Sequence, residues 1–261
     1  MNTGEPTVSA WDARAGSRLR CLVVFLPCAA FAFGYTILLL LYAFLAPASC
    51  ARHRARIIHP WGRTALWMLG IRLEVHGREH LAWPGALIVM FNHQSLLDLF
   101  VLSALWPPQA TVVYKKEFER VPLIGRTMKA LGMISIDRSR GTASFRSLAE
   151  VSQRIRTEGL LLFIAPEGTR SRSGGLQAFK MGPFHLAALS KAPVIPMILR
   201  GIPELLPMGS RLARTGRIRV DFLPPIDTRD WEPSRVRQHA VNVRQIFLRH
   251  LPPARSKEER E

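Results

Sequence analysis

The sequence predicts an α/β fold in which a single domain holds a mixed sheet with helices on both faces, preceded by a long apolar segment. Apolar or alternating runs of strand length recur along the chain, and amphipathic runs of helical length separate most of them. Glycine and proline mark many of the boundaries between these runs. A hydrophobic content of 48% over 261 residues is ample for the core of such a domain.

The first element is an uncharged run, residues 21–51, rich in leucine, alanine and phenylalanine. As one helix it would extend about 46 Å at 1.5 Å per residue, more than the roughly 30 Å of a bilayer core. The run therefore predicts a tilted membrane helix, or a membrane helical hairpin that breaks at Pro27, Gly34 or Pro47. It exceeds the roughly 7 to 15 residues of a signal-peptide core, which disfavours cleavage. We assign residues 1–18 to a flexible N-terminus and residues 19–70 to a membrane anchor with a basic, aromatic connector.

The pattern of alternating strands and helices then occupies residues 71–251, and a polar tail follows at 252–261. Continuous apolar runs such as "GALIVMF" indicate a sheet that is covered on both faces. Strands are expected at 71–77, 85–91, 110–114, 133–138, 160–166, 193–199 and 217–223. Helices are expected at 95–105, 122–132, 142–157, 182–191 and 233–251.

The charge balance predicts an anionic partner. The chain has 36 Lys and Arg against 19 Asp and Glu, which gives a net charge of +17. Nucleic acid, a phospholipid surface and a phosphorylated substrate all fit this excess. No recognised nucleic-acid motif is present, so a membrane phospholipid surface is favoured. All 3 cysteines lie in or beside the apolar run, which excludes a cysteine nucleophile or cysteine zinc site from the rest of the chain.

The stretch "FNHQSLLDLF", residues 91–100, places His93 and Asp98 at the expected junction between a strand and a helix. Ser95 and Asp98 could form a capping box, and His93 would then be a loop residue with no functional role. Alternatively, the Asp98 carboxylate could bind one ring nitrogen of His93, fix its tautomer and leave the other nitrogen as a general base. A spacing of five is poor for two side chains on a regular helix, so the second interpretation requires the junction.

Four blocks in this order resemble the glycerolipid acyltransferases, over about residues 71–225. "NHQSLLD" is similar to the first family motif, and "YKKEFERVPLIGRTMKALGMISIDRS" to the second block. "IAPEGTRSRSG" and "APVIPMIL" resemble the third and fourth. Ala165 stands where the third block usually has phenylalanine, which changes no polar group. Four ordered matches are far more specific than any one of them.

The resemblance implies transfer of an acyl chain from acyl-CoA or acyl-carrier protein to the sn-2 hydroxyl of 1-acyl-sn-glycerol 3-phosphate, which gives phosphatidic acid for phospholipid synthesis. His93 would be the general base and Asp98 would orient it. The acceptor would be bound by Arg138, Glu167, Gly168, Thr169 and Arg170. No cofactor, metal or nucleic acid is expected. Thioester donors would place the catalytic domain on the cytoplasmic face of the membrane.

The residues of "EGTR" suit an anion, because the segment follows an expected strand where open α/β sheets bind ligands. Arg170 can hold a phosphate through its planar fork, Thr169 offers a hydroxyl, and Gly168 lets backbone amides approach closely. By resemblance, Glu167 would bond a glycerol oxygen or orient an arginine. Weaker candidates for phosphate contacts are Lys115, Lys116 and Lys180.

Two alternatives stay open. The acceptor could be another lysolipid, such as a lyso-ornithine lipid or another lysophospholipid. From a different class, the chain could be a basic membrane-anchored protein that binds nucleic acid or lipid. "HGREH", residues 76–80, matches a reversed zinc-protease signature, but Gly77 and the preceding alternating strand disfavour the helix that this metal site needs.

Overall fold

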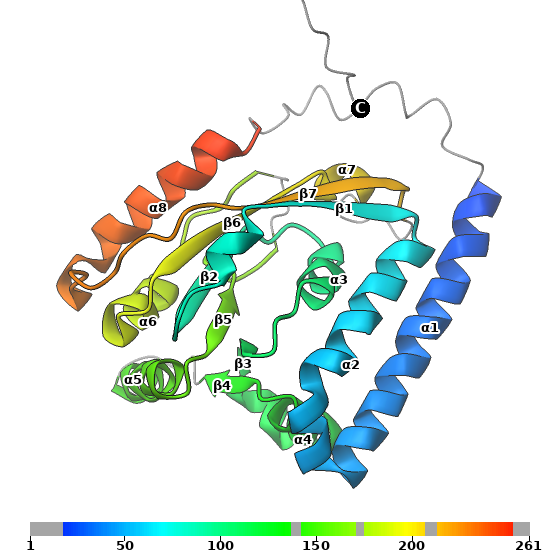
Figure 1. Cartoon of the computed structure of the whole chain (residues 1–261), viewed down its shortest axis with the longest axis horizontal. Coiled ribbons are helices and arrows are strands. Elements are labelled where there is room, and N and C mark those ends of the chain that lie inside the picture. The colour runs from blue at the N-terminus through cyan, green and yellow to red at the C-terminus, as the bar shows by residue number, and fades with distance from the viewer. Residues whose placement is uncertain (1–17, 137–141, 171–174, 207–212, 253–261) are drawn as a thin grey trace, which may run out of the picture.

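The computed structural model describes residues 18–136, 142–170, 175–206 and 213–252. In these residues, two long helices lead into a seven-stranded sheet of order β1-β7-β6-β2-β5-β3-β4 (Figure 1). Neighbouring strands are parallel except for β6 and β7, which are antiparallel, so the predicted mixed sheet is confirmed. The strands are β1 Ile71–His76, β2 Leu87–Phe91, β3 Ala110–Lys115, β4 Ile134–Ile136, β5 Leu161–Ile164, β6 Val194–Arg200 and β7 Gly216–Phe222.

Helices cover both faces of the sheet, as predicted (Figure 1). Alternate side chains of β2 enter two different cores, because successive residues of a strand point to opposite faces. Leu87 and Val89 pack in the core beneath α1, α2 and α3, whereas Ile88 and Met90 pack beneath α5, α6 and α8. The helices are α1 Arg18–Leu45, α2 Pro47–Met68, α3 Leu97–Ala104, α4 Pro122–Ala130, α5 Thr142–Thr157, α6 Gly182–Ser190, α7 Ile202–Leu205 and α8 Val236–His250.

The N-terminal apolar run and the basic connector together form a helical pair. Helix α1 continues through Pro27 and ends at Leu45, and α2 begins with Pro47 in its first turn. Proline suits that position because the first helical N–H groups have no partner within the helix. The Tyr35 hydroxyl donates to the Ile57 carbonyl at 2.8 Å, and the two helices run antiparallel (Figure 1). A helical hairpin is therefore confirmed, with its turn next to Pro47, one apolar arm and a second arm formed mainly by the basic connector.

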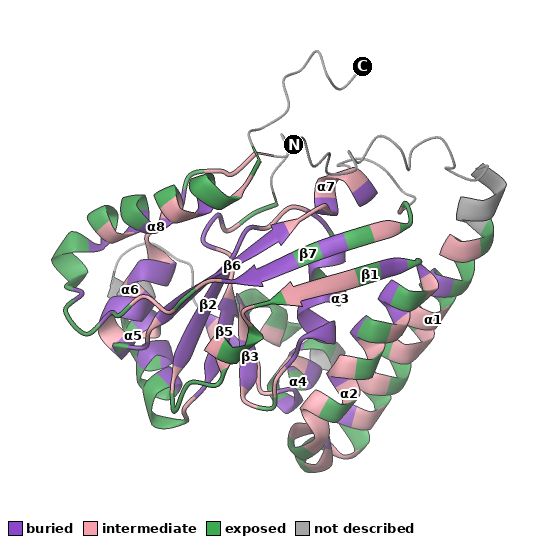
Figure 2. Cartoon of the chain, turned by 45° about the horizontal axis from the view of Figure 1, so that its top comes forward, coloured by how far each residue is buried: buried purple, intermediate pink, exposed green. Residues whose placement is uncertain are grey.

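The outer face of α1 is apolar and exposed. Residues 23–45 have a mean hydropathy of 2.2, and only 6% of the most apolar window is buried. Phe33, Leu38 and Leu45 are 70%, 67% and 77% exposed. Figure 2 shows α1 mostly exposed or half-buried, in contrast to the buried central strands. A helix of this length and composition that is not covered by protein is suited to a lipid environment.

The connector α2 packs directly on the domain. Its buried residues Ile58 and Leu66 share one core with Leu97 and Val101 of α3. The two helices approach so closely at Gly62 that a Cβ there would lie 2.4 Å from the Ala104 nitrogen. The helical pair is thus a continuation of the domain core rather than a separate unit.

Some local features differ from the sequence-based expectations. The pattern did not predict the short helices η2 Arg78–Leu81, η3 Lys116–Arg120 and α7. The final helix is split into a 3-10 turn, η4 Pro233–Arg235, and α8. The histidines of "HGREH" do not share an α-helix, because His76 ends β1 and His80 lies on η2 with its Nδ1 2.9 Å from the Phe222 carbonyl. The expected loose ends at 1–18 and 252–261 lie outside the described residues except for Arg18 and Pro252.

The close contact at Gly62 generates a prediction. Gly62→Ala should lower the free energy of unfolding by about 1–3 kcal/mol, because the added methyl group meets the α3 backbone. Gly34→Ala is the matched control in α1, since nothing lies within 4 Å of its added methyl group. The control should be neutral or stabilising by up to about 1 kcal/mol. Thermal unfolding of both variants in one detergent checks this, and equal effects would contradict the packing.

Candidate active site

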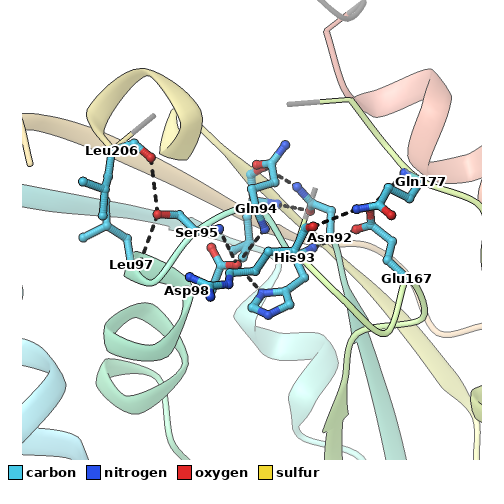
Figure 3. Close-up of polar contacts among 11 residues, drawn as sticks. Asn92, His93, Gln94, Ser95, Leu97, Asp98, Glu167, Gln177 and Leu206 are labelled. Carbon is cyan, nitrogen blue, oxygen red and sulfur yellow. Dashed lines mark hydrogen bonds and ion pairs between the residues drawn. The ribbon is translucent and has the colours of Figure 1, made fainter. Parts of the chain in front are cut away.

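The loop that carries His93 leaves the middle of the sheet. It follows β2, which lies between β5 and β6, at the edge where parallel strands end and open sheets bind ligands. The Asn92 side chain donates to the Leu199 carbonyl at 2.9 Å and accepts from the Leu199 N–H at 2.8 Å. This amide extends the pairing of β2 and β6 beyond Phe91. Asn92 therefore fixes the point at which the chain turns away from the sheet (Figure 3).

His93 and Asp98 meet at the junction between strand and helix. The His93 Nδ1 lies 2.6 Å from Asp98 Oδ2, and the same oxygen accepts the N–H groups of Gln94 at 2.7 Å and Ser95 at 3.0 Å (Figure 3). A carboxylate offers only acceptors, so His93 donates from Nδ1 and keeps a lone pair on Nε2. The Asp98 side chain is 1% exposed and the His93 side chain is 30% exposed. Within the described residues, Nε2 has no hydrogen-bond partner.

The geometry contains one part of each interpretation of the opening motif, because Asp98 contacts both the turn before α3 and the His93 ring. Asp98 accepts the backbone N–H of Ser95, as the acidic half of a capping box does. The capping serine itself is displaced, because α3 begins at Leu97 with Leu96 in the N-cap position. The Ser95 hydroxyl reaches the Leu97 N–H only at 3.4 Å. The carboxylate thus orders the first turn and the imidazole at once.

Glu167 ties this loop to the segment that follows "EGTR". One carboxylate oxygen accepts the His93 N–H at 2.8 Å, and the other accepts the Gln177 N–H at 2.8 Å (Figure 3). The residue is 2% exposed. Burial raises the pKa of the Glu167 carboxyl above its usual value, and the two backbone N–H groups offset only part of that rise.

The rest of "EGTR" forms an exposed cationic turn. Gly168 has a φ of +71°, and a Cβ there would lie 2.8 Å from Lys180 Cδ and 3.0 Å from Lys180 Nζ. Thr169 and Arg170 are exposed, and the Arg170 carbonyl accepts from the Gln177 side chain at 2.8 Å. In the part of the chain that the structure describes, neither Arg170 nor Lys180 forms an ion pair. Arg138, the remaining predicted phosphate contact, lies outside the described residues.

Sequence reasoning assigned no role to Asn92 or Gln177. Asn92 stood in the quoted motif, but its partner Leu199 is 107 residues away in the chain. Gln177 lies beyond the glycine-rich loop, and only the fold brings its N–H to Glu167. The sequence held a signal for Asn92 alone. It is a polar residue directly after a continuous apolar strand, where a buried side-chain amide needs a hydrogen-bond partner.

Comparison with known proteins identifies relatives. The pattern that defines the Acyltransferase family matches residues 72–200. A 1-acyl-sn-glycerol-3-phosphate acyltransferase from Limnanthes douglasii is 36% identical over 194 residues, which are 74% of this chain and 68% of that protein. The enzyme of the same name from Cocos nucifera is 34% identical over 74% of this chain and 62% of its own length. The chain thus spans about two thirds of these relatives.

A solved structure shares the fold. The crystal structure of the 1-acyl-sn-glycerophosphate acyltransferase from Thermotoga maritima superposes with a TM-score of 0.70 at 22% identity. The match covers 90% of this chain and 99% of that protein.

The burial of Glu167 generates a prediction about pH. The folded protein holds the Glu167 proton more tightly than the unfolded chain, so ionisation of this group costs stability as pH rises from about 4.5. The free energy of unfolding of the native protein, minus that of Glu167→Gln, should fall across this range and then level off. The fall is about 1.4 kcal/mol for each unit of pKa elevation. Denaturant titrations at several pH values measure it, and a rising difference would contradict the burial argument.

Proposed function

This chain belongs to the Acyltransferase family, and on that premise we propose that it transfers a fatty acyl chain from acyl-CoA or acyl-carrier protein to the sn-2 hydroxyl of 1-acyl-sn-glycerol 3-phosphate. The product would be phosphatidic acid. The observation that carries the proposal is the His93 imidazole, held through Nδ1 by Asp98 and open at Nε2. The names of the relatives support the choice of acceptor.

We propose that His93 acts as the general base. Its Nε2 takes the proton of the acceptor hydroxyl while that oxygen attacks the thioester carbonyl, so a C–O bond forms and the C–S bond then breaks. The imidazolium returns the proton to the departing thiolate. Asp98 stabilises the imidazolium between these steps, and base catalysis of this kind contributes about 100-fold to 10,000-fold. The thioester is already activated, so no acyl-enzyme is required.

The acceptor phosphate would bind at the cationic turn. Arg170 offers a planar fork to a phosphate, and Thr169 and the backbone around Gly168 offer further donors. Arg138 would add a contact. Both oxygens of Glu167 already accept backbone N–H groups, so we propose that Glu167 positions the His93 loop against the turn, whether or not it also contacts the glycerol.

The exposed apolar face of α1 indicates membrane association. We propose that the helical pair lies in one leaflet rather than across the bilayer. Helix α2 runs along α1 and exposes Arg52, Arg56 and Arg63. A spanning α1 would carry these arginines into the hydrocarbon, where each costs about 2.5–3.5 kcal/mol. Thioester donors are cytoplasmic, so we assign the domain to the cytoplasmic face.

The first test is a pair of variants. His93→Ala should lose about 100-fold to 10,000-fold in kcat because no base remains. Asp98→Asn should lose at least about 100-fold, because a neutral amide lacks the negative charge that holds the ring N–H of His93 and stabilises the imidazolium. Acyl transfer is followed by thiol release, and vesicle binding serves as the folding control. A His93→Ala variant with native turnover would overturn the mechanism.

The second test is a panel of acceptors. We expect acylation of 1-acyl-sn-glycerol 3-phosphate with both donor types, and at least about tenfold lower kcat/KM for a lysolipid without an anionic phosphate, since the arginine fork would lose its partner. Equal rates on lyso-ornithine lipid would favour the alternative acceptor. DNA binding that is sensitive to salt, with no acyl transfer to any acceptor, would favour the nucleic-acid interpretation instead.

A further inference from the structure

A crevice of about 370 Å³ lies where the turn between α1 and α2 meets α4. This volume falls within the range of small-ligand sites. Its apolar wall consists of small residues, and two cations of α4 complete it. The lining residues are Ala43, Pro47, Ala48, Ala51, Ala130, Arg126 and Lys129.

The only charged groups that line the crevice within the described chain are cationic. Arg126 places its guanidinium carbon 4.5 Å from the centre of the Phe44 ring and forms no ion pair with a described residue. Lys129 is 61% exposed, and its Nζ lies 3.6 Å from Glu119 Oε1, a loose pair that water can compete with. The two cations are three residues apart on α4, so they share one face of that helix.

The crevice continues the lipid-facing surface of α1. Phe44 and Leu45 are 45% and 77% exposed and belong to the last turn of that helix, immediately before the wall formed by Pro47. A molecule that sits here would contact apolar surface on the α1 side and cations on the α4 side. The N-terminal end of α2 adds partial positive charge, because its N-cap residue Ala46 forms no side-chain capping bond.

This crevice is separate from the proposed catalytic site. His93 follows the C-terminal end of β2, whereas Lys129 and Ala130 precede the N-terminal end of β4. Strands β2, β5, β3 and β4 are parallel to one another, so these two ends lie at opposite edges of the sheet. Figure 1 shows α4 beside the turn between α1 and α2 at the bottom of the view, below α3.

We propose that this crevice binds the headgroup of an anionic membrane phospholipid, with the phosphate between Arg126 and Lys129 and the acyl region against Phe44 and the alanine wall. The proposal rests on the membrane association of α1. A bound lipid would join the helical pair to α4 and hold the turn at the depth of the headgroups. It is a second lipid site, distinct from that of the acyl acceptor.

Lipid retention tests the proposal without any turnover. The full chain is purified in detergent, mixed with phosphatidylglycerol or phosphatidylcholine, and examined by native mass spectrometry. We expect one phosphatidylglycerol on the native protein, retained in preference to phosphatidylcholine. Arg126→Gln with Lys129→Gln should weaken retention roughly tenfold or more, since each cation near a lipid phosphate contributes on the order of 1 kcal/mol.

Two matched variants distinguish lipid binding in the crevice from non-specific attraction of the lipid to the basic protein surface. Arg237→Gln with Arg249→Gln removes the same charge from exposed positions on α8, and it should retain the lipid. Ala51→Leu leaves the net charge unchanged and fills the crevice, so this variant should not retain the lipid. It also provides the test if the α4 variant does not fold. Retention by Ala51→Leu, equal loss in the α8 control, or displacement of the lipid by inorganic phosphate would overturn the proposal.

The outcomes also separate this proposal from the proposed function. Acyl transfer by a protein that retains no phosphatidylglycerol would refute the crevice site alone. Retention of phosphatidylglycerol by a protein that transfers no acyl chain would support the crevice site and refute the catalytic proposal.

Discussion

Three N–H groups converge on one oxygen of Asp98, and the rest of the site depends on that convergence. The backbone N–H groups of Gln94 and Ser95 set the turn into α3, and the ring N–H of His93 sets the direction of the imidazole. A buried carboxylate without such donors would be costly, so the loop conformation and the charge require each other. One carboxylate oxygen therefore orders both the turn before α3 and the His93 imidazole.

The remaining contacts hold that arrangement at the sheet edge. Asn92 fastens the end of β2 to β6, and Glu167 joins the His93 N–H to the Gln177 N–H beyond the cationic turn. Segments that are 74 and 107 residues apart in the chain thereby fix one imidazole. The helical pair extends the same core to the exposed apolar surface of α1, so that surface and the His93 loop belong to one body.

Local pattern was sufficient for most of the fold. Periodicity predicted all seven strands of the described sheet because each strand carries its own burial signal. The meeting of His93 and Asp98 was also accessible, because five residues of chain allow few ways to join them. The hydrogen-bond partners of Asn92 and Glu167 could not be predicted from local sequence, because those bonds form only when distant segments of the chain come together. The hairpin break was ambiguous for a related reason: Pro27 is accommodated inside α1, whereas Pro47 starts α2, and packing decides between them.

The protonation state of the His93 ring shows directly whether Asp98 holds the imidazole through Nδ1–H. Nitrogen-15 NMR of the labelled protein reports which ring nitrogen carries the proton in the neutral imidazole. We expect the Nδ1–H tautomer in the native protein, and a mixture with substantial Nε2–H when Asp98 is replaced by alanine. A native protein whose neutral His93 is protonated at Nε2, with Nδ1 facing the carboxylate unprotonated, would contradict it.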